Sequence, residues 1–271
     1  MSPPGSTHAP AATPAGTSSA TEVALLPVLD DNYIAILHND REAVVVDPAV
    51  AAPVIAWLEE RGLQPVAVLQ THHHHDHIGG TPALLQRWPQ LRVLAAAAEI
   101  GRIPFQTEGL HDGDRLQVLG RPLEVLAVPG HTRGHLAFHL PAHGGQPPEL
   151  FCGDALFAAG CGRLFEGTPE QLHASLQRLA ALPAATRVWC AHEYTLTNLR
   201  WAADLRPGDG AIQARLAAVR QQRAAGLPSL PSTIGEEGRT NLFLQAADAV
   251  EVGRLRQHKD QWLPLSPEPA R

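Results

Sequence analysis

The sequence has few cysteines, and their arrangement matches no common cysteine motif. Only Cys152, Cys161 and Cys190 occur among 271 residues, and no two of them have Cys-x-x-Cys spacing. An odd number without paired spacing indicates neither a disulfide framework nor a zinc site built from thiolates. We therefore expect three small buried side chains in a protein of the reducing cytoplasm.

Long apolar runs and basic blocks are also missing. No segment approaches the ~18 consecutive apolar residues that a membrane-spanning helix needs. Residues 2–20 are rich in Pro, Ala, Ser, Thr and Gly and lack the basic start and apolar core of a signal peptide. The formal net charge is -6, and Lys and Arg are scattered. These absences predict a flexible tail over residues 1–20 and argue against membranes and nucleic acids as partners.

The rest of the chain has the composition of a globular protein. Hydrophobic residues make up 44% of the sequence and charged residues 18%, and 271 residues allow one large domain with an appendage. Up to about residue 187, short β-rich runs alternate with helical patterns, which is typical of layered sheets and helices. The predicted strands include 22–28, 33–37, 43–46, 66–70, 123–128 and 187–190.

Helical patterns mark two parts of the chain. Apolar residues at helical spacing predict a helix over 51–58, with Gly62 as its stop. After Tyr194 helices dominate: Thr195 can cap one, residues 212–219 mark another, and a last one spans about 248–258. Residues 141–148 are Pro-rich and indicate a loop between two strands. We expect domains at 21–193 and 194–271.

The most informative segment follows the predicted strand 66–70 and contains four adjacent histidines. It reads Thr71-His72-His73-His74-His75-Asp76-His77-Ile78-Gly79-Gly80. In an extended segment alternate side chains share a face, so His72, His74 and Asp76 would project together. A sharp turn at the two glycines would bring His77 to Asp76 before a helix that begins near Thr81. The segment therefore predicts four metal ligands, with His73 and His75 turned away.

Three later residues complete the donor set. His131, Asp154 and His192 each come just after a β-rich run. Because α/β folds gather functional loops at the carboxyl ends of strands, we expect these side chains to meet the histidine segment. Borderline divalent ions such as Zn²⁺ bind imidazole and carboxylate ligands, and ions of Fe and Mn bind them as well. His135 is expected to support its neighbours by hydrogen bonding, and Asp47 to hold a loop rather than bind metal.

At this point the chain resembles a known family. The pattern Thr-His-x-His-x-Asp-His with a later His, Asp and His is that of the metallo-β-lactamase superfamily, and the resemblance implies an αββα sandwich with mixed α/β (α+β) content. Within it the chain resembles the hydroxyacylglutathione hydrolases, or glyoxalase II, whose C-terminal domain is helical and binds substrate. This narrower match rests on four segments: Gly160-Cys161-Gly162-Arg163-Leu164-Phe165-Glu166-Gly167, Ala191-His192-Glu193-Tyr194-Thr195-Leu196-Thr197-Asn198-Leu199, Pro231-Ser232-Thr233-Ile234-Gly235-Glu236-Glu237 and Arg256-Gln257-His258-Lys259-Asp260.

The resemblance implies two divalent ions per chain, most readily Zn²⁺. It assigns His72, His74 and His131 to one ion, Asp76, His77 and His192 to the other, and Asp154 to both. A hydroxide between the ions would attack the thioester of S-(2-hydroxyacyl)glutathione, with Asp76 and Asp154 acting through that hydroxide. Water on a metal ionises near pH ~7, so no side-chain base is needed.

The resemblance also implies a small-molecule partner, a glutathione thioester. We expect the protein to be a monomer. Arg256 and Lys259, three residues apart on the last predicted helix, would share a face and grip a glutathione carboxylate. Arg163, Phe165 and Tyr194 would line the same pocket. Here Arg163 and Phe165 stand where the family often has Lys and Tyr, which removes one possible hydrogen bond.

Several other functions are compatible with the same ligand pattern. Other superfamily members are β-lactamases, lactonases, persulfide dioxygenases and RNA-processing nucleases, and some act on other thioesters. A secreted β-lactamase should carry a signal peptide and a nuclease should have a basic surface, and neither feature is predicted here. The pattern of the persulfide dioxygenases lacks the long helical C-terminal region that this sequence predicts. A different class would be a metal-buffering protein without turnover. The complete ligand set and the retained Arg256 and Lys259 favour the hydrolase.

Overall fold

The computed structural model describes residues 20–263, so the tail predicted over residues 1–20 lies almost wholly outside the described residues. The first six strands are β1 (Glu22–Val28), β2 (Asn32–His38), β3 (Glu42–Val46), β4 (Gln64–Leu69), β5 (Arg92–Ala96) and β6 (Glu108–Leu110). The later strands are β7 (Arg115–Val118), β8 (Arg121–Ala127), β9 (Leu136–Leu140), β10 (Glu149–Gly153), β11 (Leu156–Phe157), β12 (Gly160–Cys161), β13 (Arg187–Cys190) and β14 (Ser232–Thr233). The helices are α1 (Ala52–Arg61), α2 (His75–Ile78), α3 (Thr81–Arg87), α4 (Pro169–Ala180), α5 (Thr195–Leu205), α6 (Gly210–Ala224), α7 (Ile234–Thr240) and α8 (Ala249–Gln261), with a 3-10 turn at Ala97–Glu99.

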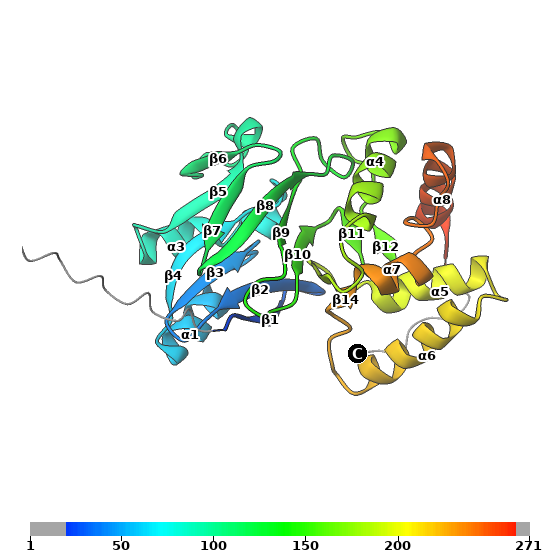
Figure 1. The fold of residues 1–271 in the computed structure, drawn as a ribbon, viewed down its shortest axis with the longest axis horizontal. Coiled ribbons are helices and arrows are strands. Elements are labelled where there is room, and N and C mark those ends of the chain that lie inside the picture. Colours follow the sequence, from blue (N-terminus) through cyan, green and yellow to red (C-terminus); the bar gives the residue numbers. More distant parts are fainter. Residues whose placement is uncertain (1–19, 264–271) are drawn as a thin grey trace, which may run out of the picture.

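Two six-stranded sheets pack face to face, and a small hairpin stands beside them. The sheets have the orders β1-β2-β3-β4-β5-β6 and β14-β13-β10-β9-β8-β7, and β11 pairs with β12. In the first sheet β3, β4 and β5 run parallel, and in the second β10 runs parallel to β13. Parallel neighbours need crossover connections, and α1 and α3 supply them for the first sheet. Figure 1 shows the sheets between α1 and α3 on one side and α4 on the other.

Three apolar clusters hold these layers together. Between the sheets, Leu37 and Leu69 meet Val125 and Phe138, all fully or almost fully buried. Outside the first sheet, α1 and α3 bury leucines and valines against β2, β3 and β4. Outside the second sheet, α4 and the C-terminal helices share a third cluster around Trp201. Alternate residues of each central strand thus serve opposite faces, which confirms the predicted αββα sandwich with a helical C-terminal region.

The helical region, defined here as residues 194–263, gathers at one end of the sandwich (yellow to red in Figure 1). Its helix α8 packs against α4. Its strand β14 pairs antiparallel with β13, so this region also extends the second sheet. Within residues 20–263, none of the helices combines the length and apolar character needed to cross a membrane.

Most elements expected from the sequence are present, with one local correction. β1 and β13 have the predicted bounds, the segment 141–148 joins β9 to β10, and Asp248 caps α8 by accepting from Glu251 N at 2.8 Å. The prediction that Thr195 caps a helix is wrong. Tyr194 is the N-cap of α5 without a capping bond, and the hydroxyl of Thr195 accepts a hydrogen bond from Ser229 Oγ at 2.6 Å.

The three cysteines are free and buried, as expected. Burial raises the pKa of Cys161 to about 11 and that of Cys190 to about 12, so both thiols stay protonated at neutral pH. They therefore behave as small apolar side chains.

Candidate metal centre

Three imidazoles converge at one end of the sandwich. His72 and His74 follow β4, and His131 follows β8. The Nδ1 atom of His74 lies 3.0 Å from Nε2 of His72 and 3.1 Å from Nε2 of His131. A tetrahedral zinc ion with bonds of about 2.0 Å holds its ligand atoms roughly 3.3 Å apart. The three nitrogens are therefore spaced as one ion would require.

A second group lies beside the first. Asp76 and His77 belong to α2, and His192 follows β13. The Oδ2 atom of Asp76 lies 3.7 Å from Nε2 of His77 and 3.5 Å from Nε2 of His192. Together these atoms form another set of three possible ligands within 4.8 Å of one another.

Asp154 lies between the two groups and presents one oxygen to each. Its Oδ1 atom is 3.4 Å from Nε2 of both His77 and His192. Its Oδ2 atom is 3.4 Å from Nε2 of His131. A carboxylate has lone pairs on both oxygens, so this side chain can serve two cations at once.

Two of these atoms are unsatisfied buried polar atoms. Among the described residues, Nε2 of His77 and Oδ1 of Asp154 are buried without any hydrogen-bond partner. Buried polar atoms are nearly always satisfied, because leaving one unpaired costs about 1–3 kcal/mol. A cation between them would satisfy both, and the imidazole and carboxylate donors suit a borderline divalent ion.

Hydrogen bonds on the far side of the rings fix which nitrogen faces the centre. Thr71 Oγ1 lies 2.6 Å from Asp47 Oδ2 and 3.0 Å from His72 Nδ1. Since the carboxylate takes the hydroxyl proton, His72 Nδ1 must donate to the hydroxyl and Nε2 is left free. His77 Nδ1 likewise donates to Asp47 Oδ2 at 2.9 Å. Asp47, which also accepts from Thr71 N at 2.8 Å, holds the loop as expected and orients two rings.

Two more of the five rings are oriented in the same manner. His131 Nδ1 donates to the carbonyl of Arg163 at 2.8 Å, and His192 Nδ1 donates to Asp31 Oδ1 at 2.8 Å. A carbonyl can only accept, so the hydrogen must be on Nδ1 of His131 and its Nε2 is available as a ligand.

Sequence reasoning missed two residues where the turn after β1 leads into β2. Asp31 holds His192, and Asn32 Nδ2 donates to Asp76 Oδ2 at 3.1 Å. The only sequence signal for them is the run Asp30-Asp31-Asn32, which is also common in ordinary turns. Their role follows from the sheet packing, which places this turn against residue 192.

The two groups differ in electrostatics. Burial, reinforced by the neighbouring imidazoles, lowers the pKa of His74 to about 4 and that of His72 well below its usual value. These rings are neutral at pH 7, which is the form that binds metal. Burial would also lower the pKa of His192, but Asp154 and Asp31 outweigh it and raise that pKa to about 10. The second group therefore releases a proton when it takes up a cation.

The histidine segment departs from the expected geometry in one respect. Extended backbone ends at His74, and α2 begins at His75, so Asp76 does not continue the strand-like alternation. Gly79 and Gly80 form the expected turn before α3, but with right-handed φ of -59° and -82°, so neither position needs the left-handed conformations that glycine adopts easily. Glycine is required here because the surroundings leave no room for a side chain: a Cβ on Gly80 would lie 2.6 Å from the carbonyl oxygen of Pro48.

The remaining histidines of the motif surround the centre. His73 faces Glu99 and Arg102, and His75 is the first residue of α2. His135 stacks on His72 with ring centroids 4.6 Å apart and accepts a hydrogen bond from Asp154 N at 3.2 Å. His135 thus supports the backbone of the shared aspartate.

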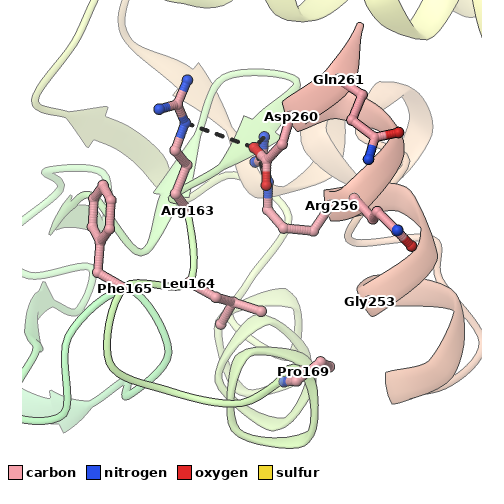
Figure 2. Close-up of a pocket in the computed structure, with 9 residues that line it drawn as sticks. Arg163, Leu164, Phe165, Pro169, Gly253, Arg256, Asp260 and Gln261 are labelled. Atoms are coloured by element: carbon pink, nitrogen blue, oxygen red, sulfur yellow. Dashed lines mark hydrogen bonds and ion pairs between the residues drawn. The ribbon is translucent and has the colours of Figure 1, made fainter.

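A pocket of about 520 Å³ lies between the loop after β12 and α8. Arg163, Phe165, Arg256 and Asp260 are among its lining residues, and Figure 2 shows Arg163 reaching toward Asp260. The Phe165 ring lies 5.2 Å from that of His131 and 5.6 Å from that of His74, measured between centroids. Phe165 therefore connects the pocket to the first histidine group.

Only some of the residues expected to bind substrate line this pocket. Arg256 lines the pocket but is only 5% exposed, and its Nη2 atom donates to Asp260 Oδ1 at 2.7 Å. Lys259 does not line the pocket, and its ammonium lies 5.2 Å from the Trp201 ring centroid. Tyr194 stacks on the His192 ring, with centroids 4.8 Å apart. The structure thus brings Arg163, Phe165 and Arg256 together and leaves Lys259 and Tyr194 outside that lining.

Comparison with protein families gives two adjoining matches. Residues 28–192 match the model described as metallo-beta-lactamase superfamily, and residues 193–262 match the model described as hydroxyacylglutathione hydrolase C-terminus. The chain is 59% identical to a hydroxyacylglutathione hydrolase of Synechococcus sp. (strain CC9605) over 241 residues, covering 88% of this chain and 97% of that relative.

Solved structures resemble the chain at lower identity. The crystal structure of ETHE1 from Myxococcus xanthus has a TM-score of 0.64 and 25% identity, covering 90% of this chain and 93% of that one. The crystal structure of TTHA1623 in a di-iron-bound form has a TM-score of 0.56 and 27% identity, covering 82% of this chain and 99% of that one.

Proposed function

The chain belongs to the metallo-β-lactamase superfamily and, within it, to the hydroxyacylglutathione hydrolases, and on that premise we propose its reaction. The protein hydrolyses S-(2-hydroxyacyl)glutathione, with S-D-lactoylglutathione as substrate, to glutathione and D-lactate. This is the second step of methylglyoxal detoxification. The observation that carries the proposal is similarity along both parts of the chain, since a relative of that name is 59% identical over 88% of it.

We propose two divalent ions per chain, with Zn²⁺ as the metal and Fe or Mn as alternatives. One ion would be held by His72, His74 and His131, the other by Asp76, His77 and His192, and Asp154 would be shared. The spacing of the nitrogens and the two unpartnered buried atoms support this assignment, as does the di-iron form of one structural relative. When bound, the ions supply a water that ionises near neutral pH and positive charge for the developing oxyanion.

Asp76 and Asp154 are the proposed catalytic carboxylates. Burial would raise the pKa of each, but it is outweighed by several neighbours together: His77, Asn32 and His192 for Asp76, and His77, His192 and His131 for Asp154. Both pKa values therefore lie below the ordinary carboxyl value. Both side chains therefore keep their negative charge at neutral pH and can accept a hydrogen bond from the attacking water. The leaving group is a thiolate, whose conjugate acid has a pKa near ~8.5, so the chain need not donate a proton to it.

The substrate's glutathione would lie in the pocket beside Phe165. Arg163 is the proposed first contact for its carboxylate, because this side chain is 67% exposed at the pocket. The other proposed substrate residues are Phe165, Tyr194, Arg256 and Lys259. Phe165 offers an apolar face next to His74 and His131. Because it has no hydroxyl, the substrate would bind there without the hydrogen bond that a tyrosine at this position could make.

We also propose that the protein acts in the cytoplasm as a monomer and binds neither nucleic acid nor membrane. Three free buried thiols and a net charge of -6 support this setting. Residues 21–193 would carry the metal ions and, with Arg163 and Phe165, one side of the glutathione site, and residues 194–271 would carry the other side of that site.

A substrate panel tests the function. Purified, metal-loaded protein should release glutathione from S-lactoylglutathione and leave a lactam and a lactone almost unchanged. Removal of metal by a chelator should abolish the activity, and added metal should restore it. Faster turnover of the lactone, or of a thioester without glutathione, would replace the proposed substrate with another superfamily reaction.

A further inference from the structure

The hairpin β11–β12 connects two parts of the metal centre. It begins just after Asp154 and ends just before Arg163, whose carbonyl accepts from His131 Nδ1 at 2.8 Å. Gly162, at its end, is tightly enclosed: a Cβ there would lie 2.1 Å from Asp154 O and 2.8 Å from His131 Nδ1. Any shift of the hairpin therefore moves the shared carboxylate and the orientation of one ring.

Two asparagines of the helical region hold the carbonyls of this hairpin. Asn198 Nδ2, on α5, donates to Ala158 O at 2.9 Å. Asn241 Nδ2, at the end of α7, donates to Phe157 O at 3.2 Å and to Gly160 O at 3.0 Å. Both side chains are almost completely buried, so water cannot replace these bonds at low cost.

Two charged side chains hold the rest of the hairpin. Glu237 Oε2 accepts from Ala159 N at 2.7 Å, and Ala159 has a φ of +57°, which side chains with a Cβ rarely adopt. Arg256 Nη1 donates to Cys161 O at 2.9 Å. Hydrogen bonds to charged groups are stronger than neutral ones, so this unusual turn is firmly fixed. Of the described side chains that bond to the hairpin, these four come from the helical region, and the buried thiols of Cys152 and Cys190 reach it from the second sheet.

We propose that the helical region positions the metal centre through this hairpin, with Asn198 and Asn241 as positioning residues for Asp154 and His131. The region would then contribute to metal affinity and not only to substrate binding. This inference rests on the proposed metal centre but not on the identity of the substrate.

Metal affinity of the full chain, measured by competition of Zn²⁺ with a chromophoric chelator, tests the proposal. Asn198→Ala and Asn241→Ala should each weaken metal binding by roughly tenfold, the lower end of the effect seen when groups supporting metal ligands are removed. Neither residue is a proposed ligand or substrate contact, so an effect on affinity reports the position of the hairpin.

Arg121→Met is the matched control. Arg121 is 2% exposed and, like the asparagines, donates to backbone carbonyls, those of Pro141 at 3.2 Å and Pro147 at 2.8 Å, which lie outside the hairpin. This variant should lose thermal stability like the asparagine variants and keep its metal affinity within about twofold. The inference is overturned if all three variants bind metal alike. A wild-type chain that binds no metal would overturn the proposed function as well.

Hydrogen exchange on the unmodified protein gives a second test that does not depend on folding of a variant. Because coupling between sites is reciprocal, stripping the metal should speed exchange at Ala159 N and along α7. Exchange in α1, which packs on the far sheet, should stay the same. Unchanged exchange in α7 upon metal removal would contradict the proposal.

Discussion

Replacement of Asp47 by Asn should weaken metal binding without any change in a ligand. The Asp47 carboxylate is 4% exposed and accepts from Thr71 N, Thr71 Oγ1 and His77 Nδ1 at 2.8, 2.6 and 2.9 Å. An amide of the same size has one accepting oxygen, so at least one of these donors faces an NH₂ group. A lost hydrogen bond to a charged group costs about 1.5–3 kcal/mol, which corresponds to roughly 10- to 100-fold in affinity.

The loss of affinity should mainly concern the ion held by Asp76, His77 and His192, because Asp47 bonds directly to His77. Competition with a chelator of known affinity, followed for both ions, measures the change. Asp114→Asn is a suitable control, since this half-exposed carboxylate lies in a turn, where it accepts from His111 N at 2.8 Å and lies 3.8 Å from Nδ1 of the same histidine. If Asp47→Asn binds both ions as tightly as the control does, the proposed orientation of His77 through Asp47 is wrong.

Three further predictions concern the proposed substrate residues. Lys259→Ala should raise KM for the glutathione thioester about 5- to 100-fold with kcat little changed. Arg256→Ala should raise KM and also weaken Zn²⁺ binding, because Arg256 donates a hydrogen bond to Cys161 O. Steady-state kinetics combined with a metal titration distinguishes the two variants. Burial, with help from Arg256, lowers the pKa of Lys259 to about 8, so kcat/KM should fall as pH rises through 8, and Lys259→Arg should remove that fall from the pH profile. Phe165→Tyr should lower KM several-fold by restoring a hydroxyl at the pocket, and an unchanged KM would exclude a substrate contact there.

The sequence predicts the layers of the fold because its strands and helices differ in apolar periodicity. β1 and β13 were predictable from β-branched and apolar runs between turn residues, and α8 from its spacing and from Asp248 as a cap. Short strands such as β6 and β14 have too few residues to show a period, and their pairing depends on neighbours far along the chain. Tertiary context decides such segments.

The candidate ligands were predictable because they follow strand ends in a recognisable pattern, whereas their supports were not. Asp31 ends the turn after β1 and Asn32 begins β2, and sequence alone cannot connect either residue to the metal centre. Arg256 and Asp260 are four residues apart on a helix, so their ion pair could have been foreseen. The bond from Arg256 to Cys161 O joins residues 95 positions apart, and only the folded chain reveals it.

The central claim is that five imidazoles and two carboxylates hold two cations in one chain. Native mass spectrometry of the intact protein, equilibrated with excess Zn²⁺ and then freed of loosely bound metal, counts the ions directly. The account predicts a mass increase of two zinc ions per chain, reduced to one or none in Asp154→Ala. A wild-type chain that retains a single ion, or an Asp154→Ala chain that still retains two, would contradict it.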